Sequence, residues 1–343
     1  MGNPTPTLSR MKWMPRTELR PSVGALLGCL LAVIPGGLNA DDSSGAPSQA
    51  GTRTGAGDGD GFQGRPQTLV RLSGEYVGPS DLGEGGSKVS FAQVGLQGQI
   101  PFALVGALSG NLGLGVQYRG YDIQDAGTFF GGLDAPVDQV LAARIAPGLF
   151  YRLNDRWRLF ASGSWLYNGA VGSSVSEATL WGGLVGVFYQ ISDSFTLVGG
   201  FGFSERFDES NLYIPVLGFR WKIDDRWNLV AGDVATSLNG PTLGAQLSYR
   251  LDEQWRLFGI GGFEGTFTRL SDDSSIPDGS LRYRSAAALV GAEYEFVPGW
   301  SARVYAGARI AQQYTFRDAE GVEVAGDTTG TSPTAGFVLR AAF

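Results

Sequence analysis

The chain has 343 residues, of which 43% are hydrophobic, 17% charged and 12% aromatic, and its formal net charge is −7. So many hydrophobic and aromatic residues exclude an intrinsically disordered protein. The sequence has no histidine, which removes the commonest general base and the commonest metal ligand, and its only cysteine is Cys29. We therefore expect no enzymatic activity, no cofactor and no metal site, and an acidic chain of this kind is a poor partner for nucleic acids.

Residues 1–40 have the features of a secretory signal peptide. Basic residues precede an apolar run of 12 residues, 23–34, and a small residue, Ala40, fits a cleavage site. The run is too short for a transmembrane helix, which needs about 20 apolar residues. A lipoprotein signal ending at Cys29 is the alternative, but the apolar run continues beyond that cysteine.

Residues 41–67 change in composition to small and polar residues with almost no large apolar side chain. This composition predicts a disordered periplasmic linker. No later segment has the apolar length of a membrane helix, so any membrane crossing must be made by strands.

A nine-residue pattern that is typical of a β-hairpin recurs five times. Its clearest copy reads Tyr151-Arg152-Leu153, Asn154-Asp155-Arg156, Trp157-Arg158-Leu159, and further copies begin at Tyr189, Trp221, Tyr249 and, less regularly, Tyr294. Each copy has alternating residues on both sides of a short polar turn. An aromatic residue flanks each side of the turn on one face, as expected for a girdle at a membrane interface. The predicted girdle consists of Tyr151, Trp157, Tyr189, Phe195, Trp221, Trp227, Tyr249, Trp255, Tyr294 and Trp300.

The strands beyond these turns alternate between apolar and polar residues, which predicts one face toward lipid and the other toward a lumen. The fold class we predict is all-β: a transmembrane, antiparallel, up-and-down β-barrel of about 14 strands over residues 68–343, with 12 strands as the alternative. The doubtful turn lies between Pro101 and Asn111. We expect long loops at 122–137, 270–280 and 317–333. The predicted strands are 68–77, 87–100, 111–122, 138–153, 156–168, 178–191, 194–206, 210–223, 226–235, 241–251, 254–268, 281–296, 299–316 and 334–343.

Arginines repeatedly occupy the polar positions of these strands. They predict either a basic lumen that favours anions or an ion-pair network that fills a closed barrel, and the sequence leaves both open. The i, i+2 spacing of the two glutamates in the set suits ion pairs to lumen arginines better than a catalytic carboxylate pair. The predicted lumen-lining residues are Arg119, Arg152, Arg158, Arg250, Arg256, Arg303, Arg309, Arg340, Glu293 and Glu295.

The chain ends on an amphipathic strand in which Phe337, Leu339 and the final residue Phe343 share one face. Such an ending resembles the C-terminal assembly signal of bacterial outer-membrane barrels. Together with the signal peptide and the short Asp-x-Trp turns, it makes the chain similar to uncharacterised outer-membrane β-barrel families. That resemblance implies the outer membrane as location, with outer-membrane lipid and the barrel-assembly machinery as partners, and an even strand number places both termini in the periplasm. It implies no substrate and no oligomeric state.

A soluble β-propeller is the rival fold, because propellers also repeat tryptophan and aspartate near turns. The first aromatic residues of successive copies are 38, 32, 28 and 45 residues apart, whereas propeller blades keep a nearly constant period of about 40–45 residues. This irregular spacing favours the barrel.

A barrel of this width predicts a passive, porin-like channel for small solutes. The alternatives are a non-conducting structural or surface-binding barrel and a transporter of hydrophobic compounds. The last would need an N-terminal plug, for which the polar linker is poorly suited.

Overall fold

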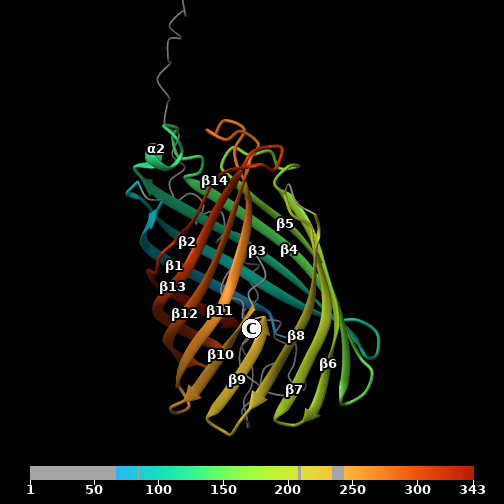
Figure 1. The fold of residues 1–343 in the computed structure, drawn as a ribbon. Coiled ribbons are helices and arrows are strands. Elements are labelled where there is room, and N and C mark those ends of the chain that lie inside the picture. Colours follow the sequence, from blue (N-terminus) through green and yellow to red (C-terminus); the bar gives the residue numbers. More distant parts are fainter. Residues whose placement is uncertain (1–66, 84, 208–209, 234–242) are drawn as a thin grey trace, which may run out of the picture. The chain divides into compact units, whose positions relative to one another are not determined.

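The computed structural model describes residues 67–83, 85–207, 210–233 and 243–343. The predicted signal peptide lies outside these ranges, as does the predicted linker except for residue 67. No helix in the described ranges is long and apolar enough to cross a membrane. The strands (Figure 1) are β1 Leu69–Leu82, β2 Ser87–Ala103, β3 Leu108–Gln124, β4 Gln139–Arg152, β5 Trp157–Ala170, β6 Thr179–Ser192, β7 Phe195–Ser204, β8 Leu212–Lys222, β9 Trp227–Asp233, β10 Leu243–Arg250, β11 Trp255–Arg269, β12 Ser280–Val297, β13 Trp300–Arg317, β14 Glu323–Thr329 and β15 Ser332–Ala342, and one short helix, α2, spans Ala126–Phe129.

All strands belong to one antiparallel sheet that closes on itself, because β15 pairs with both β13 and β1. β14 and β15 pair with successive parts of β13 in one continuous register, with Thr329 opposite Gln312 and Ser332 opposite Arg309. They are therefore two parts of one wall strand, and the barrel has 14 strands, as predicted. The doubtful turn exists, since β2 and β3 stay paired as far as Ala103 and Ser109.

The last wall strand begins earlier than predicted. Residues 317–333 were expected to form a loop, but Glu323–Thr329 pair with the end of β13. The sequence pattern missed this part because its residues are polar and lack a lipid-facing apolar series. β13 also contains a bulge at Ala311, which has a φ of 50°. The extra residue shifts the alternation, so that Arg309 and Gln312 are both buried inside the barrel.

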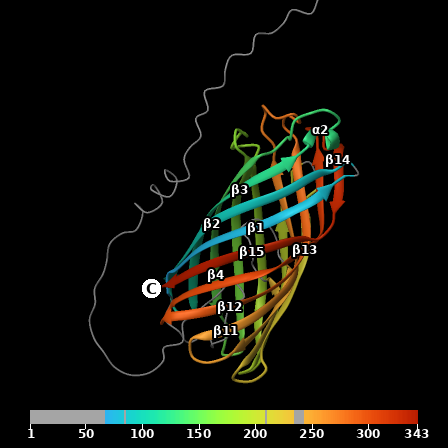
Figure 2. The same ribbon diagram turned by 90° about the vertical axis from the view of Figure 1, so that its left-hand side faces the viewer.

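The short turns are closed by the side chain of their first residue. The Oδ1 atom of Asn154 accepts hydrogen bonds from the backbone N–H groups of Arg156 (2.9 Å) and Trp157 (3.0 Å). Asp224 and Asp252 make the same pair of bonds in their turns. These Asx turns fix the tryptophan as the first residue of each following strand. We call this end of the barrel the turn end and the opposite end, which carries α2, the loop end (Figure 2).

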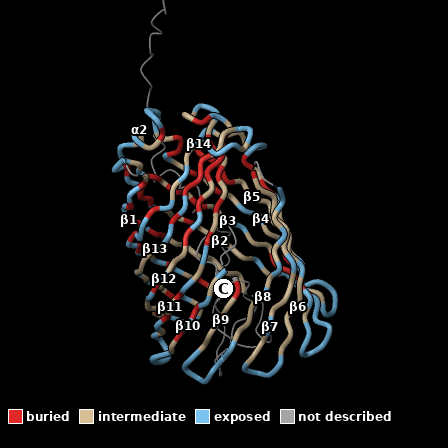
Figure 3. The backbone as a smooth tube through the Cα atoms, in the orientation of Figure 1, coloured by how far each residue is buried: buried red, intermediate tan, exposed pale blue. Residues whose placement is uncertain are grey.

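The loop end is closed by an apolar core inside the barrel. Phe130, which follows α2, packs against Phe316 of β13 with ring centroids 4.9 Å apart, and Tyr283 of β12 packs against Tyr314 at 5.0 Å. Buried positions gather toward this end (Figure 3). The cluster draws residues from β1 to β5, the loop after β11, β12 and β13. Its side chains fill the space between opposite walls.

The walls also touch at this end. Gly169 of β5 is a parallel bridge partner of Arg269 of β11, and the Nδ2 atom of Asn168 donates to the carbonyl of Phe267 at 2.5 Å and to Thr268 Oγ1 at 3.3 Å. These two strands lie on either side of β6–β10 in the sheet order. The barrel is thus drawn together at the loop end.

Candidate functional site: the barrel lumen

The alternation of exposure along the strands separates the outer from the inner face. Leu247, Val290 and Val304 belong to the highly exposed apolar series, whereas their strand neighbours Gln246 and Glu293 are buried. Since the sheet is closed, the exposed apolar series is the outer face and the alternate residues face the lumen. The lumen is therefore the place where polar groups from distant strands meet.

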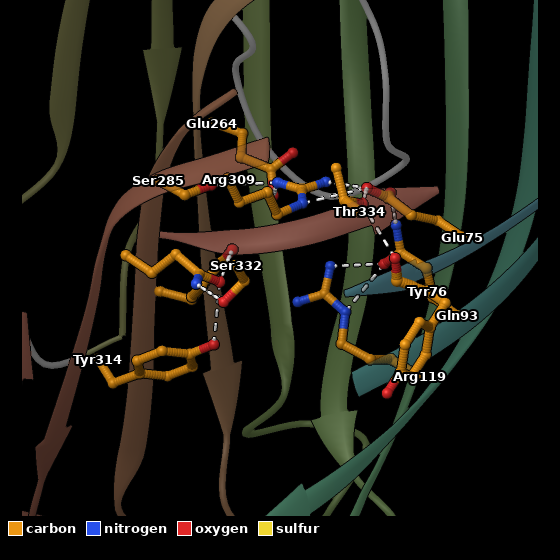
Figure 4. Close-up of polar contacts among 12 residues, drawn as sticks. Glu75, Tyr76, Gln93, Arg119, Glu264, Ser285, Arg309, Tyr314, Ser332 and Thr334 are labelled. Atoms are coloured by element: carbon orange, nitrogen blue, oxygen red, sulfur yellow. Dashed lines mark hydrogen bonds and ion pairs between the residues drawn. The ribbon is translucent and has the colours of Figure 1, made fainter. Parts of the chain in front are cut away.

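The most deeply buried polar group is centred on Arg309 of β13 (Figure 4). Its Nη2 and Nε atoms donate to Glu75 Oε1 at 2.6 and 3.1 Å, and its Nη1 atom donates to Ser285 at 3.1 Å. The same guanidinium is ion-paired with Glu264 of β11. The side chains of Arg309 and the two glutamates are at most 3% exposed. The buried guanidinium of Arg309, bound by two carboxylates and a serine, links β1, β11, β12 and β13.

A hydrogen-bonded chain extends this group to β2 and β3. Gln93 donates from Nε2 to Glu75 Oε2 at 2.8 Å and accepts two hydrogen bonds from Arg119, at 2.9 Å from Nε and 2.7 Å from Nη2. The Arg119 guanidinium lies over the ring of Phe91, 4.7 Å from its centroid. The network thus sits directly beside the apolar core of the loop end. We name these residues, Glu75, Gln93, Arg119, Glu264 and Arg309, the inner network.

A second polar cluster lies on β10 to β13, nearer the turn end. Glu293 accepts a 2.8 Å hydrogen bond from Arg303 Nη2 and one of 2.8 Å from the Ser301 hydroxyl, and it lies 3.6 Å from Arg256. The Arg303 guanidinium lies 4.4 Å from the ring centroid of Phe258. One carboxylate here faces two arginines, so this part of the lumen carries an excess of positive charge.

Three pairs of arginines lie directly opposite each other on neighbouring strands near the turn end. They are Arg152 and Arg158, Arg250 and Arg256, and Arg71 and Arg340. Like charges that face each other across two strands are destabilising. These three pairs add to the positive charge of the inner wall near the turn end.

The whole inner face is basic although the chain as a whole is acidic. Among the described strand residues, the inward-facing acidic positions include Glu75, Glu264, Glu293, Glu295 and Asp327. The inward-facing basic positions are Arg71, Arg119, Arg144, Arg152, Arg158, Arg220, Lys222, Arg250, Arg256, Arg303, Arg309 and Arg340.

Each predicted lumen residue lies on the inner face, but in three different surroundings. Arg119 and Arg309 belong to the inner network, and Arg256, Arg303 and Glu293 to the second cluster. The remaining ones lie at the turn end. Glu295 there accepts a hydrogen bond from the Gly299 backbone N–H at 3.1 Å, so it closes a turn and does not pair with Glu293. The sequence analysis missed Glu75, Gln93 and Glu264, although they share the polar alternation that identified the arginines.

Another part of the inner wall, over β6–β8, is apolar and only partly buried. It presents Leu184 and Phe188 of β6, Val198 of β7, and Ile214 and Val216 of β8, interspersed with glycines such as Gly186 and Gly200. Polar lumens usually lack such a surface. The lumen therefore has a charged wall and an apolar wall.

Eight of the ten predicted girdle residues form four pairs of ring contacts on the outer face at the turn end. Ring centroids are 4.2 Å apart for Trp157 and Tyr189, 4.7 Å for Trp227 and Tyr249, and 4.8 Å for Trp255 and Tyr294. Among the remaining girdle members, Phe195 packs edge-on against Trp221, and Tyr151 is exposed. Their place at a membrane interface stays a prediction.

The residues of the predicted assembly signal also face outward. Phe337, Leu339 and Phe343 are exposed, and Phe343 packs edge-on against the girdle residue Trp300 at 5.5 Å. Thr68 and Phe343 hydrogen-bond to each other, so the two ends of the barrel chain meet at the turn end.

In the described part of the chain, one group of carboxylates is close enough to hold a cation. The ligand atoms of Glu177, Asp272 and Asp278 lie within 4.8 Å of one another at the loop end. A hydrogen bond from Asp278 raises the pKa of Asp272, as expected when two carboxyl groups share a proton. Exposed acidic groups are common without a metal, and this one adds no function to the lumen.

A closed, even-stranded antiparallel barrel with an apolar outer face and a charged inner face defines an outer-membrane β-barrel protein, a fold that implies the bacterial outer membrane. The family model described as a domain of unknown function, DUF6268, matches residues 134–335. Because this is more than half of the chain, the protein belongs to that family. No curated protein matches the chain.

Several solved outer-membrane barrels are similar in outline. A FadL homologue of Pseudomonas aeruginosa is 14% identical with a TM-score of 0.45, over 80% of this chain and 89% of the other. The COG4313 outer-membrane channel of Pseudomonas putida F1 is 12% identical with a TM-score of 0.45, over 84% and 100%. The toluene transporter TodX of P. putida is 12% identical with a TM-score of 0.41, over 81% and 90%. Similarity at this level does not transfer a ligand to this chain.

Proposed function

We propose that the protein is an outer-membrane channel for small anionic solutes whose outer end is closed in this conformation. The turn end would face the periplasm, as short turns do in outer-membrane barrels. Outer-membrane barrel enzymes that use a catalytic histidine differ from this chain, which has no histidine. We propose no catalytic role.

The observation that carries this proposal is the charge of the inner face. Three opposed arginine pairs at the turn end and a cluster with two arginines per glutamate create a positive potential in a low-dielectric tube. A lumen lined in this way concentrates anions and repels cations. Like-charge pairs destabilise the folded barrel. A channel that conducts anions would retain them because they attract its solute.

The loop end explains why conduction would be gated. The inner network and the apolar core fill the space between β1–β4 and β11–β13, and β5 touches β11. A path for ions requires the segment around α2 to move away from Phe316 and the walls that carry the inner network and the apolar core to separate. The channel would therefore open rarely in the intact protein.

The experiment is single-channel recording of the refolded protein in planar bilayers under a salt gradient. We expect infrequent openings with a reversal potential that indicates anion selectivity. Replacing residues 126–137 by a short Gly-Ser linker removes Phe130 from the core and should make openings longer and more frequent. The matched control is Leu133→Ser, in the same loop but exposed, which should leave gating unchanged.

This experiment tests the anion selectivity and the gating independently of each other. Cation-selective openings would refute the anionic substrate but keep the channel. Silence of the loop-replaced variant, when heat-modifiable gel mobility proves that it is folded, would refute the channel. The double variant Arg152→Gln/Arg158→Gln should shift the reversal potential toward zero, whereas Arg156→Gln in the exposed turn should not.

A transporter of hydrophobic compounds is the second candidate, favoured by the apolar inner wall over β6–β8. This function predicts that an apolar fluorescent probe binds inside the lumen. Leu184→Ser should weaken that binding, while Val185→Ser, its outward-facing neighbour, should not. Equal binding by both variants would remove the support for this candidate.

A further inference from the structure

Five arginines gather around Phe267 at the loop end, and the four of them on β11, β12 and β13 are opposite in alternation to the lumen arginines. On β12, Arg282 and Arg284 alternate with the buried Tyr283 and Ser285 and therefore point outward. The neighbouring strand ends and the segment after β7 add further guanidinium groups. The arginine surface consists of Arg206, Arg269, Arg282, Arg284 and Arg317.

Strand pairing brings these side chains together. Arg282 lies opposite Phe267 of β11, and both Arg282 and Arg206 lie over the Phe267 ring, each 5.3 Å from its centroid. Arg269 and Arg317 lie opposite the same residue, Ser280, from the two sides of β12. Arg284 is exposed, whereas the other four are half-buried.

The arginine surface lies one membrane thickness away from the aromatic girdle. On β12, Arg284 is ten residues from Tyr294. At about 3.3 Å per residue and a tilt of about 40°, this separation is about 25 Å along the barrel axis, the height of the apolar band of an outer-membrane barrel. With the turn end toward the periplasm, the orientation on which this inference rests, the arginines would lie level with the headgroups of the outer leaflet.

The cluster of basic residues does not continue onto the opposite side of the barrel, where Lys88 of β2 is a single exposed basic residue. At the loop end of β3, the outward residues are Tyr118, Gly120 and Asp122, none of them basic. All five arginines have a further polar or ring partner in the protein, which keeps their side chains ordered. Because each guanidinium has five N–H donors, it can bind a phosphate in addition to such a partner.

We propose that this arginine surface binds the phosphate groups of an anionic glycolipid in the outer leaflet. Outward arginines are costly against lipid tails but tolerated at the interface, and clustered guanidinium groups bind phosphate bidentately. Phe267 would contact the apolar part of the same lipid. The site is independent of the lumen, so its failure would leave the proposed channel intact, and the reverse also holds.

The test uses the full chain in phosphatidylcholine nanodiscs, titrated with bisphosphorylated lipid A and followed by native mass spectrometry. We expect Arg282→Gln/Arg284→Gln/Arg317→Gln to lower the affinity at least about tenfold, since charge-assisted hydrogen bonds are lost. Lys88→Gln, an exposed basic position elsewhere at the loop end, should bind as the unmodified protein does. If the triple variant fails to fold, the exposed Arg284→Gln alone should still weaken binding severalfold.

Three results would overturn the proposal. Equal binding of dephosphorylated lipid A would show that acyl chains alone are recognised. Displacement of lipid A by inorganic pyrophosphate at equal concentration would show a site for soluble anions. Undiminished binding by the folded arginine variants would place the lipid elsewhere.

Discussion

Replacing Arg309 by leucine tests whether the inner network stabilises the barrel as a unit. The substitution removes a cation that is 1% exposed and is the ion-pair partner of both Glu75 and Glu264, each 3% exposed. Breaking a buried ion pair from one side costs about 3–5 kcal/mol. We therefore expect the free energy of unfolding of Arg309→Leu to fall by about that amount.

The two glutamates should respond differently to the loss. Glu75 keeps hydrogen bonds from Gln93 (2.8 Å) and Thr334 (3.0 Å). Among the described residues, neither carboxylate oxygen of Glu264 has a hydrogen-bond partner, and its contact is the ion pair with Arg309. The double variant Arg309→Leu/Glu264→Gln should therefore regain more stability than Arg309→Leu/Glu75→Gln.

The assay is equilibrium urea unfolding of protein refolded into lipid vesicles, followed by tryptophan fluorescence. Arg156→Leu, in an exposed turn at the turn end, is the control and should change stability by less than about 0.5 kcal/mol. A loss below about 1 kcal/mol for Arg309→Leu, or double variants that are no more stable than the single one, would refute the idea of a tightly coupled network.

Three further predictions concern the turn end. Backbone hydrogen bonds, first from Trp227 and then from Arg226, lower the pKa of Asp224. The stability that this carboxylate contributes is therefore present above the ordinary carboxyl pKa and is lost as the pH falls through the lowered pKa. Unfolding curves recorded from pH 7 to pH 2 should show this loss in the intact protein but not in Asp224→Asn, because asparagine closes the turn as Asn154 does. Gly299 has a φ of 82° and a Cβ there would lie 3.0 Å from the Ala342 carbonyl, so Gly299→Ala should destabilise the barrel by about 1 kcal/mol in the urea assay. Deleting Phe343 removes its contact with Trp300 and should abolish recovery in the outer-membrane fraction, while normal insertion would contradict the predicted assembly signal.

The fold was predictable because the barrel repeats one simple rule. Alternation and the turn residues located the hairpins, since an aspartate or asparagine three residues before a tryptophan closes the turn with its own side chain. The first part of the last wall strand was not predicted because Glu323–Thr329 are mostly polar and lack an alternating apolar series. The bulge at Ala311 was not predicted either, because one inserted residue does not change the composition of the strand.

The site was predictable only in part. The alternation placed Arg119 and Arg309 in the lumen, but which carboxylates meet them depends on the closure of the sheet, which brings β1 beside β15. The apolar core at the loop end was missed for a related reason. Phe91, Tyr283 and Tyr314 stand at positions that are polar nearer the turns, and they become a core only because opposite walls approach each other.

The contact between β5 and β11 sets an order of events for assembly. Asn168 and Thr268 are 100 residues apart in the chain, so this contact cannot form until eleven strands have been delivered to the membrane. Contacts between such distant segments form slowly, because the loop entropy is lost before the contact is gained. Sealing of the loop end is therefore a late step. A chain delayed before this step would accumulate as an intermediate whose strands are paired but whose loop end is open.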